Sequence, residues 1–482
     1  MAAKFLIVNN GMTEARGHFV ETGVALARAA RARGFDVTMG VHARCDGRGV
    51  PADVPLLPMF RVDHWGHIVA QPRGATARLA SVARTLFPRS LFDWARAVSR
   101  ARRGLPAKPW AEGGTATAAP PRDTDPDAQL RAALGAIPPD HNEYEHYQMF
   151  AADLDRFLTK CAAGPGDHVY FPTAYGRDAL AVCALIERDG AGRLPTFHLE
   201  YRHAVLSPAE AEREPDPFKA FHSRTHRAYF AAARTRAHSP RLRFYTDTPE
   251  LATDYAALAG FGFGVLPIPF RAELIPSAPR TTRGPLRVLF LGDLREEKGF
   301  TKLPLIVRAL ITVGGVRFVI PGALHPEEHN PAMLAALAEL EAHPAGLIER
   351  PHRDGFVPAE DYYRLLASAD VVLCPYDERA YRSRSSGVFA EAVAAGKPTV
   401  VPAGTWMARE QPPGTGEAYT TASELLAALQ HVCANYDSYR SAAEAARDRW
   451  LARHSPDALL AQLLSEPERA RRGETELAEV AR

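Results

Sequence analysis

Two stretches of alternating strand-like and helix-like sequence constrain the fold of this chain more than any other feature. In the first, an apolar strand pattern at residues 5–8 is followed by a glycine loop, a helical pattern at 18–33 and a second apolar strand pattern at 35–41. In the second, the alternation restarts with an apolar run at 286–291 and continues to about residue 403. A strand, a helix and a second strand in this order open a doubly wound parallel sheet. The sequence therefore predicts an α/β fold with two Rossmann-like domains.

The length of the chain and a proline-rich stretch predict how these domains divide the sequence. At 482 residues the chain is longer than one ordinary hydrophobic core can serve. The proline-rich stretch lies between the two stretches of alternating strand and helix patterns, where an interdomain linker is expected. We expect an N-terminal domain at 1–270 that binds the acceptor, a linker at 271–285, a C-terminal domain at 286–430 and C-terminal helices at 431–482.

An arginine-rich insertion interrupts the predicted N-terminal domain at about 73–127. Its first part, 73–103, holds eight arginines and a single acidic residue, with apolar side chains such as Phe92 and Trp94 between them. This pattern favours a basic amphipathic surface that docks to anionic lipid headgroups. The alternative is an ordinary pair of solvated helices in an arginine-rich protein. The second part, 104–127, is rich in Pro, Gly, Ala and Thr and predicts a disordered excursion.

Net charge and cysteine spacing exclude several classes of function. A formal net charge of +2 gives no overall attraction to nucleic acid, so no nucleic-acid partner is expected. The five cysteines lie far apart without a Cys-x-x-Cys pair, which argues against a disulfide framework and a zinc site. The first apolar run is too short for a signal peptide or a membrane span. We expect a cytoplasmic protein, peripheral to the inner face of the membrane if the arginine-rich stretch docks there.

Two short motifs about a hundred residues apart predict an anion-binding site. They are residues 291–299, a glycine turn at the end of an apolar strand, and residues 385–401, a small-residue loop that runs into a helix. Such turns aim free backbone N–H groups and the positive end of a helix dipole at one point, which suits a diphosphate. The alternative is that the cations lie in the solvated first turn of a helix and that the serines form an ordinary helix cap. The candidate diphosphate ligands are Arg295, Lys298, Ser385, Ser386 and Gly387.

Glu391 is predicted to bind the ribose of a nucleotide. It lies in an otherwise apolar segment, 388–393, where a buried charge needs polar partners. The two hydroxyl groups of a ribose supply such partners. The alternative is a carboxylate near a helix terminus that complements the helix dipole. A diphosphate site beside a carboxylate that accepts sugar hydroxyls predicts a pocket for a nucleotide-activated sugar.

Candidate residues of the N-terminal half follow its predicted strands. A loop from Gly11 to Gly17 follows the first strand, and His18 begins the next helix, where it would face the reacting centre. The strand predicted at 196–199 holds His198, and Glu200, Arg202 and His203 follow it closely. Each of these side chains could bind the acceptor or act as a base, and we predict catalytic roles for His18 and His198. The alternative for each is a structural role.

Three sequence blocks resemble those of a large glycosyltransferase family. They follow the order and spacing of the retaining nucleotide-sugar transferases numbered family four, also called glycosyl transferases group 1. The resemblance covers about 286–403 and implies the GT-B fold, in which two Rossmann-like domains face each other across a cleft and a helical tail follows. The blocks are Gly292-x5-Lys298-Gly299, Gly355-Phe-Val-Pro358 followed by 369–375, and 391–398.

The resemblance also implies an activity and a pathway. A nucleoside-diphosphate sugar would act as co-substrate, with no separate cofactor, and its sugar would pass with retention to a hydroxyl of a glycan or lipid-linked acceptor. The product would belong to cell-surface polysaccharide or glycolipid synthesis. We expect no metal, because two fixed cations can stabilise the charge that develops on the leaving diphosphate.

The chain departs from the family pattern at two positions. Asp293 stands where the family carries an arginine, with Arg295 as the candidate substitute. Ser383 stands where the family carries a glutamate that holds the donor sugar, and Asp377 or Glu378 of a longer loop is the candidate replacement. These departures favour one alternative, a non-catalytic partner that keeps the fold. A sugar-nucleotide epimerase of the same fold is a second, whereas the lack of Gly-x-Gly-x-x-Gly argues against a dinucleotide-dependent oxidoreductase.

Overall fold

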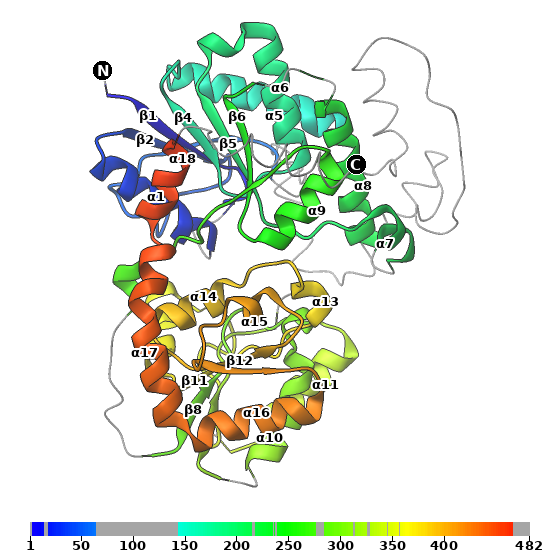
Figure 1. Cartoon of the computed structure of the whole chain (residues 1–482), viewed down its shortest axis with the longest axis vertical. Coiled ribbons are helices and arrows are strands. Elements are labelled where there is room, and N and C mark those ends of the chain that lie inside the picture. The colour runs from blue at the N-terminus through cyan, green and yellow to red at the C-terminus, as the bar shows by residue number, and fades with distance from the viewer. Residues whose placement is uncertain are drawn as a thin grey trace, which may run out of the picture.

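A computed structural model of the chain contains two α/β domains, one above the other in Figure 1. The arginine-rich stretch at 73–103 and the excursion predicted at 104–127 lie outside the residues that the structure describes. The described residues are 2–13, 18–63, 143–214, 217–234, 236, 239–275, 284–311, 314–324, 328–344, 346–355 and 357–465.

The N-terminal domain is built on a seven-stranded parallel sheet with the order β3-β2-β1-β4-β5-β6-β7. The strands are β1 (Lys4–Asn9), β2 (Asp36–His42), β3 (Leu56–Phe60), β4 (His168–Phe171), β5 (Thr196–Tyr201), β6 (Leu242–Thr246) and β7 (Gly264–Val265). β1 is buried at every position after Lys4. It therefore has the continuous apolar pattern of a central parallel strand that helices cover on both faces.

Helices pack on both faces of this sheet. One hydrophobic cluster joins the sheet to α5, α6 and α8, and another joins it to α1. The helices of this half are α1 (His18–Ala32), α5 (Glu143–Lys160), α6 (Gly176–Asp189), α7 (Pro208–Arg213), α8 (Pro217–Arg234) and α9 (Pro249–Ala259).

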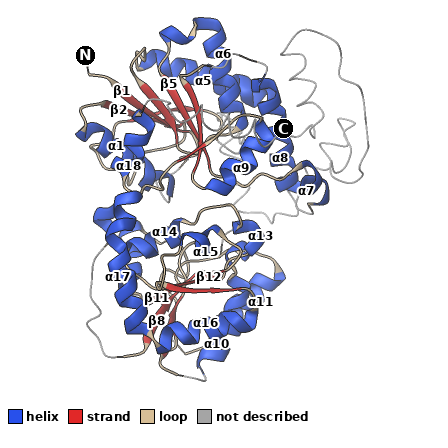
Figure 2. Ribbon diagram, in the orientation of Figure 1, coloured by secondary structure: helices blue, strands red, loops and turns tan. Residues whose placement is uncertain are grey.

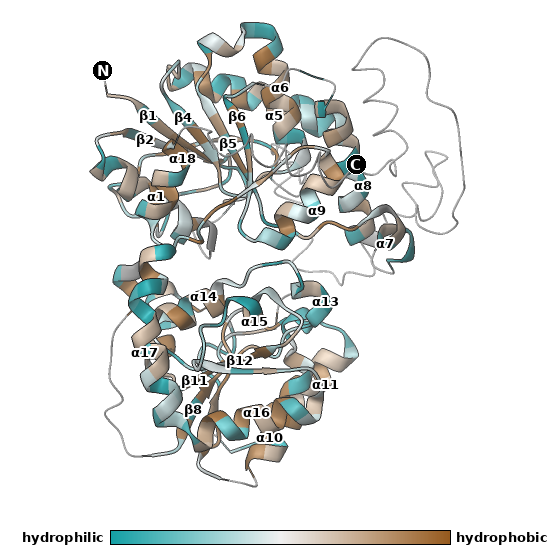
Figure 3. Ribbon diagram, viewed as in Figure 1, coloured by the Kyte–Doolittle hydropathy of each residue, from teal (hydrophilic) through white to brown (hydrophobic). Residues whose placement is uncertain are grey.

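The C-terminal domain repeats this architecture on a six-stranded parallel sheet with the order β10-β9-β8-β11-β12-β13. Figure 2 shows its strands inside a shell of helices, and Figure 3 shows the buried β11 as hydrophobic and α13 as hydrophilic. The strands are β8 (Leu286–Leu289), β9 (Val316–Val319), β10 (Ile348–Glu349), β11 (Val371–Leu373), β12 (Thr399–Pro402) and β13 (Gly416–Tyr419). The helices are α10 (Leu303–Ile311), α11 (Pro331–Glu341), α12 (Ala359–Ser368), α13 (Glu378–Tyr381), α14 (Gly387–Ala394), α15 (Trp406–Glu410) and α16 (Ala422–Ala434).

The last two helices connect the C-terminal domain back to the N-terminal domain. α17 (Tyr436–Arg453) packs against α14, and α18 (Pro456–Leu464) packs against α1 (Figure 1). Leu459, Leu460 and Leu463 of α18 are fully buried in the same cluster as α1. The helical C-terminal region therefore contributes to the core of the first domain.

The structure confirms the predicted fold class of two parallel α/β domains with a helical C-terminal region. The predicted bounds of five elements agree with the structure to within two residues, namely those of β1, α1, β2, β5 and β8. The sequence reading missed β3, whose Leu-Leu-Pro-Met-Phe sequence carries a proline on an edge strand and is only partly buried. No helix among the described residues is both long enough and apolar enough to cross a membrane.

Candidate functional site

The carboxyl ends of the two sheets face each other at the boundary between the domains. Thr248 and Asp247 follow β6 of the first domain, whereas Ser383 and Ser385 precede α14 of the second. The Thr248 hydroxyl donates to the Ser383 carbonyl at 2.5 Å, and the Ser385 hydroxyl donates to Asp247 Oδ2 at 2.5 Å. Ligands of open α/β sheets bind beyond the carboxyl ends of the strands, so this boundary is the expected place for a site.

The two motifs predicted to bind a diphosphate meet at this boundary. Gly292 has φ of 102°, and a Cβ atom added there would lie 2.7 Å from Lys298 Nζ and 3.4 Å from Val388 Cγ2. Val388 belongs to the first turn of α14. The absence of a side chain at Gly292 therefore makes room for the Lys298 ammonium group beside the N-terminal end of α14.

Gly299 fixes the backbone that carries Lys298. Its φ of 76° is left-handed, and an added Cβ would lie 1.9 Å from the Pro375 carbonyl oxygen. Lys302 Nζ donates to the carbonyls of Pro375 and Tyr376 at 2.9 and 3.2 Å. Only glycine permits this close contact between the turn after β8 and the loop after β11.

The Lys298 ammonium group has no hydrogen bond or ion pair with any residue that the structure describes. Burial lowers the pKa of Lys298, and the charge of Arg295 acts in the same direction. Asp293, whose carboxylate opposes that shift, lies 3.4 Å from Arg295 through Oδ2 and Nη2. An anion bound beside Lys298 would therefore interact with a cation that has no direct partner among the described residues.

Two serines at the start of α14 already have hydrogen bonds within the protein. Ser386 is the N-cap, and its hydroxyl accepts from the Phe389 N–H at 3.2 Å. The Ser385 hydroxyl donates a hydrogen bond to the Asp247 carboxylate. The N–H groups in the first turn of an α-helix have no hydrogen-bond acceptor within the helix. The backbone N–H groups at Gly387 and in the rest of the first turn of α14 are donors of this kind.

Glu391 lies in the second turn of α14, so a helix-terminal charge does not explain it. Its carboxylate accepts a hydrogen bond from the Tyr362 hydroxyl and one at 3.1 Å from the Tyr363 hydroxyl. Burial raises the pKa of Glu391 to about 7, against the effect of these two hydrogen bonds. The nearby charge of Lys298 also favours the carboxylate form. The structure thus brings Glu391, Lys298 and the start of α14 together.

Sequence reasoning missed Arg384, which lies between Ser383 and Ser385. Its guanidinium pairs with the Glu297 carboxylate at 3.0 and 3.5 Å and lies 4.7 Å from the centre of the Tyr381 ring. An arginine two residues before a helix cap was the available signal. The two carboxylates proposed to replace the family glutamate have other contacts: Asp377 caps α13 at Ala380, and Glu378 packs against Gly404.

The predicted catalytic role of His198 does not fit its position. The side chain is fully buried within β5. Its Nε2 lies 3.0 Å from His168 Nδ1, and its Nδ1 lies 3.4 Å from the Tyr245 hydroxyl. A catalytic side chain must reach its substrate, so His198 is a structural residue of the sheet.

The other N-terminal candidates are only partly described. Gly11 lies in a turn directly after β1, and His18 is the first residue of α1, but nothing is described of its side chain. Gly17 lies outside the described residues. Glu200 is fully buried at the end of β5 and accepts from Arg202 Nε at 2.9 Å and from the Tyr170 hydroxyl. The roles predicted for Gly11, Gly17 and His18 stay predictions.

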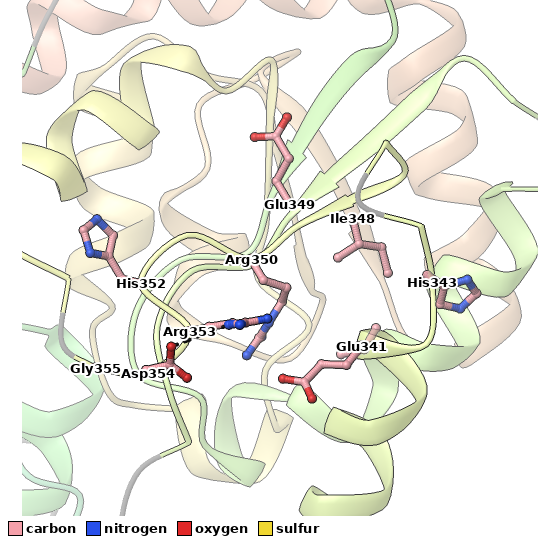
Figure 4. Close-up of a pocket in the computed structure, with 10 residues that line it drawn as sticks. Glu341, His343, Ile348, Glu349, Arg350, His352, Arg353, Asp354 and Gly355 are labelled. Atoms are coloured by element: carbon pink, nitrogen blue, oxygen red, sulfur yellow. Dashed lines mark ion pairs between the residues drawn. The ribbon is translucent and has the colours of Figure 1, made fainter.

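A separate hollow of about 1010 Å³ lies at the edge of the C-terminal sheet, beside β10 (Figure 4). Arg350 and Arg353 line it together with Glu341, and Arg350 Nη2 donates to the Gly322 carbonyl at 3.2 Å. Burial lowers the pKa of Arg350. None of the predicted site residues lines this hollow, so it is a distinct feature of the domain.

Comparisons with known proteins agree with this architecture. Residues 302–465 match the family described as glycosyl transferase-like. No curated protein matches the chain in sequence.

Solved structures resemble the chain over nearly its whole length. Sucrose-phosphate synthase from Thermosynechococcus elongatus shares 14% identity over 99% of each chain, with a TM-score of 0.60. WaaG, a glycosyltransferase of lipopolysaccharide biosynthesis, shares 13% identity over 96% of this chain and 100% of its own, with a TM-score of 0.56. HepE of Anabaena, solved in complex with UDP, shares 15% identity over 95% of this chain and 98% of its own, with a TM-score of 0.56.

These likenesses establish the GT-B fold, in which two parallel α/β domains are followed by a helical region. The family match at 302–465 adds that the sequence of the second half is similar to that of glycosyl transferases.

Proposed function

We propose that the protein is a glycosyltransferase, which moves a sugar from a nucleoside-diphosphate donor to a hydroxyl group of its acceptor. The observation that carries this proposal is the unpartnered ammonium group of Lys298 beside the N-terminal end of α14. A fixed cation and free backbone N–H groups at one point suit the anionic oxygens of a diphosphate. HepE, which shares the fold, has been solved with UDP-glucose.

The proposed roles follow from the charge that develops during transfer. As the bond between sugar and phosphate breaks, negative charge grows on the departing diphosphate. Lys298, Arg295 and the first N–H groups of α14 would stabilise that charge more in the transition state than in the ground state. Glu391 would accept hydrogen bonds from the ribose hydroxyls, and Tyr362 and Tyr363 would hold its carboxylate in place.

We propose a glycan or lipid-linked acceptor and transfer with retention, in the synthesis of a cell-surface polysaccharide or glycolipid. Support comes from the family resemblance of the sequence blocks and from the lipopolysaccharide role of WaaG. We also propose that the protein is cytoplasmic and that the arginine-rich stretch at 73–103 meets anionic lipid at the inner face of the membrane. The support for this contact is the sequence of that stretch, which lies outside the described residues.

A ligand screen followed by calorimetry tests the donor proposal. Thermal unfolding with UDP, GDP, ADP and dTDP, and with their sugars, should reveal one nucleotide that raises the unfolding temperature. Calorimetric binding of that nucleotide should be lost in Lys298→Ala and Glu391→Ala. It should persist in Arg308→Gln, a control in which an exposed arginine of α10 loses its ion pair with Glu339. Unchanged affinity in both site variants would contradict the assignment.

A further inference from the structure

Arg384 is directed back into its own domain, unlike three other arginines near the domain boundary. Those three pair with carboxylates of the N-terminal domain: Arg379 with Glu214 at 2.9 Å, Arg382 with Asp254 at 3.5 Å, and Arg409 with Glu250 at 2.5 Å. Arg384 instead pairs with Glu297, the residue directly before Lys298. Its position is therefore set by the diphosphate motif and not by the contact between the domains.

Two contacts fix the plane and direction of the Arg384 guanidinium. Glu297 accepts two hydrogen bonds from it, and the Tyr381 ring lies beneath it. Tyr381 is itself buried, with its ring centre 4.6 Å from that of Tyr376. Paired hydrogen bonds to a planar guanidinium restrict its orientation. About a quarter of the Arg384 side chain stays exposed, so a bound ligand can still reach it.

Three cations lie together around the diphosphate motif, namely Arg295, Lys298 and Arg384, and the charges of both arginines lower the pKa of Lys298. The carboxylates near them have other partners: Asp293 faces Arg295, Glu297 faces Arg384, and Glu391 accepts hydrogen bonds from Tyr362 and Tyr363. Asp247 also attracts Arg384, but its carboxylate accepts a hydrogen bond from Ser385. An anionic ligand would therefore relieve the repulsion among the three cations.

The same loop lacks the carboxylate that the family resemblance leads one to expect. Ser383 is neutral, its carbonyl accepts from Thr248, and a hydrogen bond from Ser383 opposes the rise that burial causes in the pKa of Asp254. Ser383 thus faces α9, while Arg384 faces the cations of the site. This loop therefore presents the positive charge of Arg384 to the site, where the resemblance leads one to expect the negative charge of a glutamate.

We propose that Arg384 binds an anionic oxygen of the donor, and that Glu297 positions its guanidinium. This inference rests on the proposed function. The anionic oxygen belongs either to the diphosphate or to a carboxylate on the donor sugar, because both offer anionic oxygens that accept hydrogen bonds from a guanidinium.

Calorimetric titration of the full chain with UDP, UDP-glucose and UDP-glucuronic acid tests the inference, or the matching set of the nucleotide that the screen selects. We expect Arg384→Gln to weaken binding about tenfold, the usual scale for a hydrogen bond to a charged group. Arg384→Lys should recover part of the loss, because it keeps the charge but not the paired geometry. The salt dependence of binding should fall in Arg384→Gln, which a purely structural role would not cause. Circular dichroism and the Arg308→Gln control exclude misfolding.

Each outcome gives a definite answer. Weaker binding of all three probes assigns Arg384 to the diphosphate, and weaker binding of UDP-glucuronic acid alone assigns it to a sugar carboxylate. Unchanged affinity for all three probes in a folded Arg384→Gln, together with lost binding in Lys298→Ala, would overturn the inference and leave the proposed function standing. If the wild-type protein bound no nucleotide of the screen, the proposed function would fall, and this inference with it.

Discussion

Arg177, a fully buried cation of the N-terminal domain, and Lys298, a partly buried cation of the C-terminal domain, meet very different environments. In the N-terminal domain, Arg177 at the start of α6 is fully buried and lies 3.6 Å from Glu143 and 4.0 Å from Asp178. Its Nη2 also donates to the Asp63 carbonyl, and its guanidinium lies over the Tyr175 ring at 4.5 Å. In the C-terminal domain, Lys298 has no direct partner among the described residues.

The difference shows how a structural cation is told apart from a binding cation. Arg177 has carboxylates and a carbonyl around it, so an added anion would find no uncompensated charge. Its partners Asp63 and Glu143 are the residues directly before and directly after the segment 64–142. Arg177 therefore contacts the chain on both sides of this segment. Lys298 has the opposite arrangement, because the carboxylates nearest to it are turned toward arginines. Such a charge is stabilised fully only when a ligand arrives.

Replacing Arg177 by methionine should have the largest effect and should act on folding. Glu143 and Asp178 would then be buried without their main opposite charge, which costs about 3–5 kcal/mol. Denaturant unfolding at neutral pH should show this loss. An Arg177→Met protein as stable as the wild type would contradict the structural role.

The same replacement at Lys298 should act on binding and leave folding intact. Lys298→Met removes a poorly compensated charge, so the free energy of unfolding should stay the same or rise. Affinity for the nucleoside diphosphate should fall about 100-fold, the scale of a charged hydrogen bond in a partly buried site. Calorimetry and denaturant unfolding on one preparation measure both. A loss of stability as large as that of Arg177→Met would remove the distinction between the two cations.

Gly299 tests how the Lys298 ammonium group is kept in place. Gly299→Ala should cost about 2 kcal/mol, because a left-handed backbone and a contact with the Pro375 carbonyl both oppose a methyl group. Gly34→Ala is the matched control, with φ of 87° and no atom within 4 Å of the added Cβ. Its cost should be about 1 kcal/mol. Equal unfolding free energies for the two variants would show that the Pro375 contact is unimportant.

Replacing Glu391 should have the smallest effect of these substitutions, and it should change how the stability of the protein depends on pH. Its pKa is raised to about 7 in the folded protein from an ordinary 4.5, so the folded state holds a proton there that the unfolded state has released. This group therefore favours folding below about pH 4.5, and its contribution is lost as pH rises toward 7. Glu391→Gln should flatten that fall in stability.

Donor binding should change with pH in the opposite sense. The ionised carboxylate accepts hydroxyl hydrogen bonds, so affinity for a nucleotide sugar should rise as pH passes through about 7 in the wild type. In Glu391→Gln the affinity should be about tenfold lower at pH 8 and nearly independent of pH. Calorimetry at pH 6 and pH 8 decides this. A pH profile unchanged by the substitution would remove Glu391 from the site.

The architecture could be predicted from the sequence because it depends on local patterns. Apolar runs and helical periodicity placed the central strands, and the glycine turns placed Lys298 and Glu391 at strand ends that the fold brings together. The prediction missed α9, although Thr248 as N-cap, Pro249 in the first turn and Gly260 after the last turn are signals of a helix. α9 contacts the loop of Ser383 across the domain boundary through Thr248.

The site was harder to predict where a role depends on a distant contact. The burial of His198 follows from its neighbours His168 and Tyr245 on adjacent strands, which its local sequence does not reveal. The direction of Arg384 follows from Glu297, which is 87 residues away in the chain. A pattern in one segment does not report such pairs.

The diphosphate site at Lys298 can be tested by a crystal structure with the nucleoside diphosphate that the ligand screen selects. We expect a phosphate oxygen within hydrogen-bond distance of Lys298 Nζ and of a backbone N–H in the first turn of α14. This expectation would be contradicted by a diphosphate bound in the hollow beside Arg350 and Arg353, with no phosphate at Lys298.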